Sequence, residues 1–421
     1  MILIFFSITV VAQWENVGQV IYGESGEITG GSVSFNETGE RLVLFDGNVN
    51  GDPGGMARVF ELQNGTWIQL GQGVVGFSGD LQSAGPVKMN ATGDRFIFSS
   101  PSNDSNGVQE SGIVRVFELV GGSWVQLGQD LNGEIEGDYF GYAVDISDDG
   151  ETIAIGSPQN ILNGPGYVKI FNYINGVWSQ IGSSLLGLNP EDQFGQSISL
   201  SANGDKIAIA APQNDSTGND SGLLRIFELL NNEWEQLGGD IFGTIEEDNL
   251  GGSISPGTTP LSLRGNSVAV GARGGINNPG YVKVYRYQNN SWELLGQPIV
   301  GLENSYGASL CFNEAGNILV ISDPFESLGT GIVQVFRLIN TTWQQFGESI
   351  EGDGQSDVFG LSIDLNSLGN RILIGAPFND GNGANSGKVV VLQNDDILQA
   401  SDYISNGTAL YPNPNRNSFS I

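Results

Sequence analysis

The sequence predicts an all-β protein, a seven-bladed β-propeller built from four-stranded antiparallel blades. Three observations carry this prediction. The tryptophans recur at a regular interval, the segments between them share a four-strand pattern, and the composition is rich in turn residues, with 63 glycines among 421 residues. Stacked sheets that repeat about every 50 residues are typical of propellers, where each blade buries its faces against its neighbours.

The tryptophan spacing defines the repeat. The seven tryptophans are Trp14, Trp67, Trp124, Trp178, Trp234, Trp292 and Trp343, so successive ones lie 51 to 58 residues apart. Each falls on a strand pair whose two faces are both apolar. That pattern favours packing in the core over a sugar-stacking ring, because large aromatic side chains are mostly buried.

The clearest repeat unit is Phe194–Gly243. Its expected strands are Gln196–Ser201, Asp205–Ala211, Leu223–Leu230 and Glu233–Gly238. A two-residue hairpin between the last two strands places Leu229 opposite Trp234 and Phe227 opposite Gln236. Because both faces of this strand pair are apolar, the sheet is predicted to be buried on both sides.

The number of units gives the number of blades. Units begin near Gly30, Gly85, Phe140, Phe194, Leu250, Tyr306 and Phe359. The last unit has only three strands and no tryptophan, while the Trp14–Tyr22 strand is left over at the N-terminus. Moving that segment into the last blade completes it and removes an exposed edge. We therefore predict a propeller over residues 13–393, closed by an N-terminal strand in the last blade.

A short motif connects these blades with a known repeat. Phe194-Gly195 followed by Ala210-Ala211-Pro212 resembles the FG-GAP repeat of integrin-α-type propellers, and blades 3 and 7 carry similar pairs. The resemblance spans residues 14–393 and implies a binding or adhesion module. The calcium loop of that family is not matched. Its nearest counterpart, Asp145–Gly150, lacks the closing carboxylate because Ile153 stands there, so the resemblance supplies no calcium ligands.

The two ends of the chain indicate export. Residues 1–12 are predicted to be a signal peptide, because this apolar run is too short to span a bilayer. Residues 394–409 are expected to be a linker. Residues 410–421, with Tyr411-Pro412-Asn413-Pro414, look like the truncated start of a C-terminal sorting domain of the Bacteroidetes type IX secretion system. This resemblance implies a secreted protein, extracellular or on the outer cell surface, whose C-terminal segment engages the secretion machinery.

Composition excludes several classes of function. The chain has no histidine, which removes histidine-based catalysis and histidine-ligated metals, and its lone Cys311 cannot form an intrachain disulfide. Cys311 is expected to be a small core residue. A formal net charge of -31 argues against nucleic acid as a partner. Beyond residues 1–12 we expect no transmembrane segment, and we expect a monomer.

The longer connections predict where a ligand binds. Loops from strand two to three and from strand four to one share one rim, and binding residues concentrate on long loops over a rigid scaffold. The candidate binding residues on this long-loop rim are Asp138, Asp192, Asp248, Asp357, Asn214, Asp215, Asn379 and Asp380. Two interpretations stay open. These oxygens hold a glycan or a weakly bound calcium ion, or the carboxylates cap turns.

We therefore expect a secreted or cell-surface binding module that recognises an extracellular glycan or protein and has no catalysis of its own. The alternative is a polysaccharide lyase or glycoside hydrolase that uses carboxylates on the same rim. Catalysis needs one asymmetric pair of tuned carboxylates, whereas the acidic residues here are spread almost evenly over the repeats. No catalytic residue is assigned from the sequence, and the choice of metal stays open.

Overall fold

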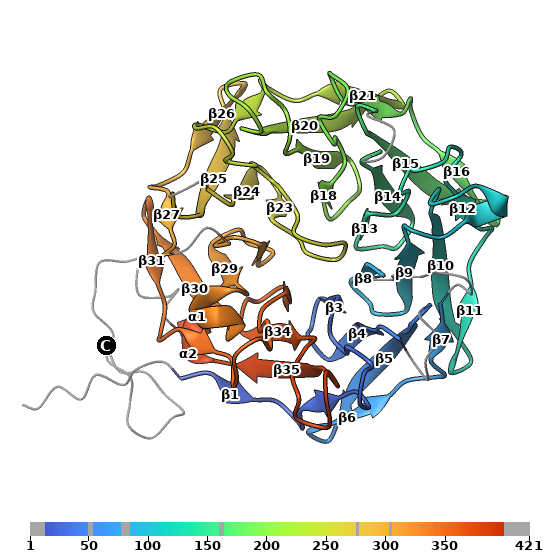
Figure 1. The fold of residues 1–421 in the computed structure, drawn as a ribbon, viewed down its shortest axis with the longest axis vertical. Helices are drawn as coiled ribbons and strands as arrows, with labels where there is room; N and C mark the ends of the chain where they lie inside the picture. Colours follow the sequence, from blue (N-terminus) through green and yellow to red (C-terminus); the bar gives the residue numbers. More distant parts are fainter. Residues whose placement is uncertain are drawn as a thin grey trace, which may run out of the picture.

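The chain folds into a ring of seven blades around a central axis (Figure 1). The computed structural model describes residues 13–48, 54–76, 85–159, 164–274, 278–302 and 305–399. Each blade is a four-stranded antiparallel sheet. A further two-residue strand pairs with the third strand of each blade, which is β35 in blade 7. The predicted all-β seven-bladed propeller is confirmed.

The strands follow one plan. Blade 1 contains β3 (Val33–Phe35), β4 (Arg41–Asp46), β5 (Met56–Gln63), β6 (Thr66–Gln69) and β7 (Val74–Val75), and blade 2 contains β8 (Val87–Met89), β9 (Arg95–Ser100), β10 (Ile113–Val120), β11 (Ser123–Gln126) and β12 (Leu131–Asn132). Blade 3 contains β13 (Ala143–Ile146), β14 (Thr152–Ser157), β15 (Tyr167–Ile174), β16 (Val177–Gln180) and β17 (Leu185–Leu186), and blade 4 contains β18 (Ser197–Leu200), β19 (Lys206–Ala211), β20 (Leu223–Leu230), β21 (Glu233–Gln236) and β22 (Ile241–Phe242). Blade 5 contains β23 (Leu261–Arg264), β24 (Ser267–Ala272), β25 (Tyr281–Gln288), β26 (Ser291–Leu294) and β27 (Ile299–Val300), and blade 6 contains β28 (Ser309–Phe312), β29 (Ile318–Asp323), β30 (Ile332–Ile339), β31 (Thr342–Gln345) and β32 (Ile350–Glu351). Blade 7 contains β33 (Ser362–Leu365), β34 (Arg371–Ala376), β35 (Lys388–Gln393), β1 (Glu15–Asn16) and β2 (Ile21–Tyr22).

The register predicted for blade 4 is confirmed. Leu229 lies opposite Trp234, and Phe227 lies opposite Gln236. The hairpin turn at residues 231–232 consists of two asparagines whose φ angles are 53° and 66°. Positive φ at both central residues is what a two-residue type I′ turn requires, and asparagine tolerates it better than most residues.

The N-terminal segment closes the ring. In blade 7, β1 and β2 both pair with β35, and their registered partners are Glu15 with Gln393 and Ile21 with Val389. Figure 1 shows β1 running beside β35 at the point where the two ends of the propeller meet. The predicted closure is confirmed, and β35 has no unpaired edge.

The outer-strand tryptophans are core residues that also join neighbouring blades. In blades 1 to 6 they are 2–9 % exposed. Each donates its indole N–H to a backbone carbonyl of the preceding connection, for example Trp67 to Val17 at 2.8 Å and Trp234 to Ile181 at 3.1 Å. The prediction of core packing, rather than a sugar-stacking ring, is confirmed for these six.

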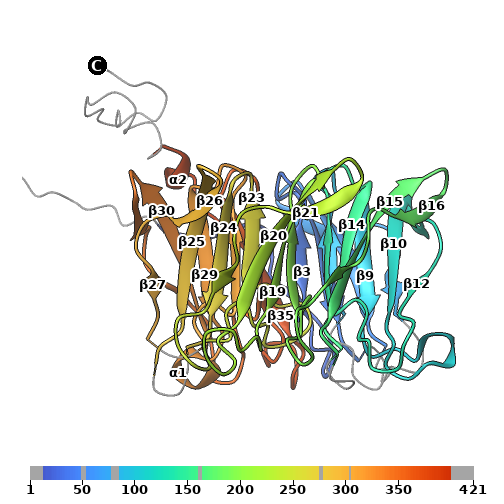
Figure 2. The same ribbon diagram turned by 90° about the horizontal axis from the view of Figure 1, so that it is seen from above.

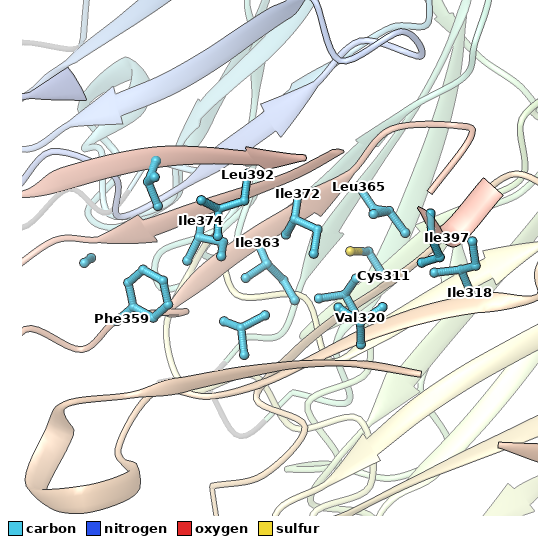
Figure 3. Packing of buried hydrophobic residues seen from close by; sticks show 14 residues of the cluster. Cys311, Ile318, Val320, Phe359, Ile363, Leu365, Ile372, Ile374, Leu392 and Ile397 are labelled. Atoms are coloured by element: carbon cyan, nitrogen blue, oxygen red, sulfur yellow. The ribbon is translucent and has the colours of Figure 1, made fainter. Parts of the chain in front are cut away.

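The interface between blades 6 and 7 extends the core beyond the last strand. Cys311, 8 % exposed, packs there with Ile318, Val320 and Ile363 (Figure 3), and burial raises the pKa of its thiol. Helix α2 (Asp396–Gln399) covers this cluster, and its Ile397 is 1 % exposed. The expected linker over residues 394–409 therefore begins with a helix packed on the propeller. The predicted signal peptide and sorting segment lie outside the described residues.

The two faces of the ring differ. The long loops, including α1 (Glu326–Gly329), gather on one face, while short turns and α2 lie on the other (Figure 2). In the described part of the chain, no helix is long and apolar enough to cross a membrane.

Deleting residues 13–22 should destabilise the whole ring rather than fray one end. The deletion exposes the edge of β35 and removes Val17, which accepts the indole hydrogen bond of Trp67. We expect a lower midpoint for one cooperative transition in thermal denaturation followed by circular dichroism. A synthetic peptide of residues 13–22, added in excess, should restore part of the loss. An unchanged midpoint would contradict closure by this segment.

Candidate functional site

Four of the predicted rim aspartates, Asp138, Asp192, Asp248 and Asp357, are buried and accept hydrogen bonds within their own blades. Asp138 is 0 % exposed. Its carboxylate accepts the backbone N–H groups of Glu134 and Ile135, both at 3.0 Å, the Tyr167 hydroxyl at 3.0 Å and the Gln159 amide at 2.9 Å. Four donors leave this carboxylate little capacity for a ligand.

The other predicted rim residues repeat this arrangement. Asp192 accepts the Asn214 amide at 2.9 Å, and Asp357 accepts the Asn379 amide at 2.6 Å. Asp215 and Asp380 are exposed, and each accepts one backbone N–H inside its own loop. The predicted residues therefore meet in pairs within a blade and do not converge across blades. Asp248 differs in one atom, since its Oδ1 is buried without a hydrogen-bond partner.

Blades 1 and 6 show that the rim carboxylate serves the fold. They carry Glu27 and Asn304 at the repeated acidic position, and each has a buried aspartate at the end of its second strand instead. Asp46 accepts the hydroxyl of Thr29, and Asp323 accepts the hydroxyl of Ser305. In these two blades the aspartate of the second strand bonds a hydroxyl group of the connection before the blade, so its hydrogen bonds also serve the fold.

The central channel is closed at the long-loop face. The connection 252–260 of blade 5, which we call the plug, crosses the axis before β23. The Ser253 N–H bonds the Gln196 side chain at 3.0 Å, and the Thr259 carbonyl accepts the Leu310 N–H at 2.9 Å. Gly257 reaches Ser32 of blade 1, on the far side of the ring: a Cβ on this glycine would lie 3.0 Å from Cβ of Ser32. The plug therefore contacts blades 1, 4 and 6.

The other end of the channel is framed by a belt of backbone hydrogen bonds. The second residues of the short turns between first and second strands are linked N–H to carbonyl from blade to blade, at 2.8–3.1 Å. Around the mouth these residues are Ala202, Asp148, Ala91, Glu37, Ser367 and Glu314. Blade 5 has a shorter turn and contributes Arg264 instead, whose Nε lies 3.7 Å from Glu314 Oε2. The belt fixes the mouth of the channel and presents three acidic side chains and one arginine there.

Local sequence explains why these side chains face the mouth. Each turn of the belt begins with asparagine or serine, whose side-chain oxygen accepts a following backbone N–H, as Asn36 does from Arg41 at 2.9 Å and Ser147 from Thr152 at 2.9 Å. A glycine with positive φ ends the turn, for example Gly150 at 71°. The second residue of the turn forms the belt through its backbone, and its side chain differs from blade to blade.

Below the mouth, one position of each inner strand faces the next blade at the channel wall. It holds Ser34, Lys88, Asp145, Ser199, Ser262, Cys311 and Asp364. Ser199 accepts the Leu263 N–H at 3.0 Å, and Asp145 accepts the Leu200 N–H at 2.7 Å, so this position bonds adjacent blades together. Because serine suffices at other blade junctions, the charge of Asp145 and Asp364 is not needed for this bond.

These walls enclose a polar cavity of about 340 Å³, which we call the central funnel. Its lining includes Lys88, Asp145, Asp148, Arg264, Glu314 and Asp364. A second cavity of about 20 Å³ is lined by Lys88 and by the plug residues Gly257, Thr258 and Thr259. The Lys88 ammonium has no hydrogen bond or ion pair with any described residue, so it is available to a ligand.

The funnel shifts the protonation of its carboxyl groups. Burial raises the pKa of Asp145, against the opposing effects of Lys88, the Leu200 N–H and Arg264. The Asp148 side chain is exposed at the mouth, yet the surrounding walls withdraw it from bulk water and raise its pKa to about 6. Nearby Glu314, Asp145 and Glu37 add to this rise, and Arg264 opposes it. Asp148 is therefore poised to exchange a proton near neutral pH.

The candidate site predicted from the sequence and the central funnel lie at opposite faces of the ring. The funnel opens among the short turns between first and second strands, and none of the predicted rim residues lines it. One signal was available: at the inner-strand position, Lys88 interrupts a series of serine, cysteine and aspartate. The nearest match to a calcium loop, around Asp145, is an ordinary turn, and the described residues contain no group of three or more acidic or cysteine side chains suited to a metal ion.

Comparison with known proteins shows the fold and no family. No protein-family model and no curated protein sequence matches the chain. Among solved structures, it is similar to a protein assigned as a 6-phosphogluconolactonase from Bacteroides uniformis, with 13 % identity, 77 % of this chain and 86 % of that one covered, and a TM-score of 0.54. The periplasmic gluconolactonase of Pseudomonas aeruginosa gives 14 % identity, coverage of 77 % and 85 %, and a TM-score of 0.52. The oligogalacturonate lyase of Vibrio parahaemolyticus gives 11 % identity, coverage of 92 % and 94 %, and a TM-score of 0.52. The propeller fold is thus confirmed, while the FG-GAP resemblance finds no support.

Asp138→Asn should weaken the fold by about 1–3 kcal/mol, the usual cost of disturbing hydrogen bonds to a buried charged group. An asparagine amide would point donors at groups that now donate to the carboxylate. Urea denaturation measures the change, and Asp380→Asn, at an exposed position, is the control expected to be neutral. A neutral Asp138→Asn with altered calcium binding in calorimetric titration would instead favour a ligand site on the rim.

Proposed function

We propose that the protein is an enzyme that acts on a small sugar acid or sugar lactone in the central funnel, with Asp148 as general base. The observation that carries this proposal is a carboxyl group whose pKa is about 6, in a cavity closed at one end and shared with an unpaired lysine. A carboxyl group with a strongly shifted pKa in a cavity is a usual mark of acid–base catalysis.

Asp148 has the chemistry of a base that works near neutral pH. Above pH 6 its carboxylate is ionised, and it faces a solvent-accessible mouth where it can take a proton from water or from a carbon next to a carboxylate. Water activated in this way opens a lactone, and proton abstraction begins a β-elimination. Both reactions place negative charge on a substrate oxygen as the transition state forms.

Lys88 and Arg264 supply the positive charge that such a reaction needs. Lys88 stands deep in the funnel, and Arg264 stands at its mouth. The ammonium of Lys88 makes no hydrogen bond or ion pair with a described residue. A substrate oxygen can therefore bind it without displacing another group, and its charge can stabilise the developing oxyanion. Arg264 is positioned to hold the carboxylate of a sugar acid beside Asp148.

The size and closure of the funnel favour a small substrate. At about 340 Å³ it lies at the lower end of the range of ligand sites, roughly 300–1,000 Å³. Its polar lining suits hydroxyl groups, and the plug prevents a polymer from threading through the ring. We therefore favour a mono- or disaccharide derivative over a long polysaccharide chain.

The similar solved structures add limited support. They are named as lactonases and a lyase of sugar acids, and at 11–14 % identity they show only that this fold carries such chemistry. One solved oligogalacturonate lyase, of TM-score 0.51, is described in complex with manganese. The described residues do not fit such a centre, because no suitable ligand group is present, and we derive no step through a metal.

The remaining expectations from the sequence stay proposals. Weak calcium binding on the long-loop rim is untested, although the buried, unpartnered Oδ1 of Asp248 is the most suitable remaining acceptor there. Export is supported by the apolar residues 1–12 and by the periplasmic location named for one similar propeller. A pure binding module on the long-loop rim is disfavoured, since the aspartates predicted for it cap turns.

Turnover should rise with pH through about 6 and be lost in Asp148→Asn. The substrate panel consists of aldonolactones, followed by acid release, and short uronate oligomers, followed by formation of the unsaturated product. Lys88→Met should lower kcat by about 10²-fold or more, the usual effect of removing one oxyanion-stabilising group. Ala91→Ser, at an uncharged belt position, is the control expected to keep activity. Substrate binding with no turnover by wild type would contradict the enzyme proposal.

A stability measurement tests the pKa of Asp148 without any substrate. A folded-state pKa of about 6, above the unpaired value of 3.8, makes the folded protein bind the proton more tightly. Its contribution to stability is present below pH 3.8 and is lost as the pH rises through about 6. Asp148→Asn should therefore melt above wild type at neutral pH and not at acidic pH. Equal pH profiles of the melting temperature would contradict the shift.

A further inference from the structure

We propose that Asp145 is a positioning residue for Lys88, and that the two form one unit in the wall of the central funnel. Asp145 accepts a backbone hydrogen bond that a lysine cannot accept, and its fixed carboxylate holds the ammonium group at the cavity that both residues line. The consequence for turnover rests on the proposed function. The consequence for folding does not, so the two are tested separately.

The inner strands carry a ring of backbone N–H groups that must be paired. Each inner strand is the edge of its blade, so the N–H that follows the channel-wall position has no strand partner on that side. In five blades the channel-wall residue of the preceding blade accepts it. The pairs are Met89 with Ser34 at 3.2 Å, Leu200 with Asp145 at 2.7 Å, Leu263 with Ser199 at 3.0 Å, Phe312 with Ser262 at 3.2 Å and Phe35 with Asp364 at 2.8 Å.

Lys88 interrupts this ring, because a lysine side chain carries only donors. The N–H group that it leaves without an acceptor belongs to Ile146 in blade 3. Asp145 accepts this group instead, with Oδ1 at 3.0 Å, while its Oδ2 keeps the bond to Leu200 in blade 4. A serine has one oxygen, and elsewhere in the ring that oxygen accepts one such N–H group. The aspartate of blade 3 therefore compensates for the lysine of blade 2.

The same compensation follows Cys311, whose sulfur is a weak acceptor. The next N–H group in the ring is that of Leu365, and Oδ1 of Asp364 accepts it at 2.9 Å. Among the seven channel-wall positions, all of which the structure describes, aspartate occurs only in the two blades that follow a residue unable to accept. Cys311 packs in the core between blades 6 and 7, whereas Lys88 lines the funnel. The second pair thus has the same bonds without a charge at the cavity.

Compensation places a fixed negative charge near Lys88. Both oxygens of Asp145 are bound to backbone N–H groups of two blades, so its carboxylate cannot rotate freely. Burial raises the pKa of Asp145, and Lys88 is the strongest of the groups that oppose this rise, so the two charges attract each other. The ammonium makes no direct ion pair with any described residue. Attraction therefore restrains it at the funnel wall and leaves its hydrogens available to a substrate oxygen.

Four proteins test the pair: wild type, Lys88→Ser, Asp145→Ser and the double variant. In Asp145→Ser the Ile146 N–H loses its acceptor inside the wall, and the melting temperature should fall by a few degrees. In the double variant the serine at position 88 can accept this group, as Ser34 does in blade 1, and most of the loss should be recovered. Should Asp145→Ser fail to fold, the double variant should still fold. Equal losses in both backgrounds, or two unfolded variants, would overturn the pairing.

The chain offers two matched controls for the melting temperature. Cys311→Ser should rescue Asp364→Ser in the same way, because the introduced serine can accept the Leu365 N–H group. Absence of this rescue would contradict the compensation on which the inference rests. Ser199→Ala removes a bond of the serine type, and it should lower the melting temperature equally with lysine or serine at position 88.

Turnover separates a positioning residue from a structural one. On the aldonolactone and uronate substrates, Asp145→Ser should lower kcat by up to about 10²-fold, with little change in KM, because the ammonium group is misplaced. In the Lys88→Ser background it should lower kcat no further, since the group that it positions is gone. An equal factor in both backgrounds would overturn the positioning role. If wild type turns over none of these substrates, the proposed function fails, while the melting temperatures still decide whether the two residues form a pair.

Discussion

The structure depends on the need to bury both faces of every blade. A four-stranded sheet whose two faces are apolar is stable only when another sheet covers each face. Seven such sheets all meet this requirement when they form a closed ring. The indole N–H of each outer tryptophan, the inner-strand serines and aspartates, and the belt at the mouth all bond one blade to the next. The ring is thus held at its outer edge, its wall and its mouth, and a ligand that enters the channel meets walls that are already fixed.

Such rigidity separates the residues that build the ring from those that are free to act. Positions occupied in the same way in most blades serve the fold, as the rim aspartates of blades 3, 4 and 5 do by accepting backbone N–H groups. Positions that vary from blade to blade do not serve the fold in this way. Lys88, Asp148 and Arg264 all belong to the second group, and they meet in the funnel. The asymmetry that catalysis requires therefore arises where the repeat is broken.

This distinction explains what the sequence could predict. Periodicity averages over seven copies, so the blade count, the Leu229–Trp234 register and the closure by β1 were readable from spacing alone. The same periodicity made Asp138 and its equivalents the predicted binding residues, although they recur because they cap turns. Asp148 lay in what looked like an ordinary turn, and nothing local indicates that its neighbours across the mouth are Arg264 and Glu314. Those contacts are set by the curvature of the ring, which no single repeat encodes. The plug was missed for a related reason, since it is an insertion in one blade only.

The plug gives the two ends of the channel different chemistry. It spans from Gln196 to Ser32 and Leu310, so its backbone blocks the axis and divides an otherwise continuous passage. On the short-turn side lies the mouth of the funnel, where the pKa of Asp148 is raised to about 6, and on the other side lie the long loops. A short stretch of polar backbone therefore bounds the channel on the side of the long loops.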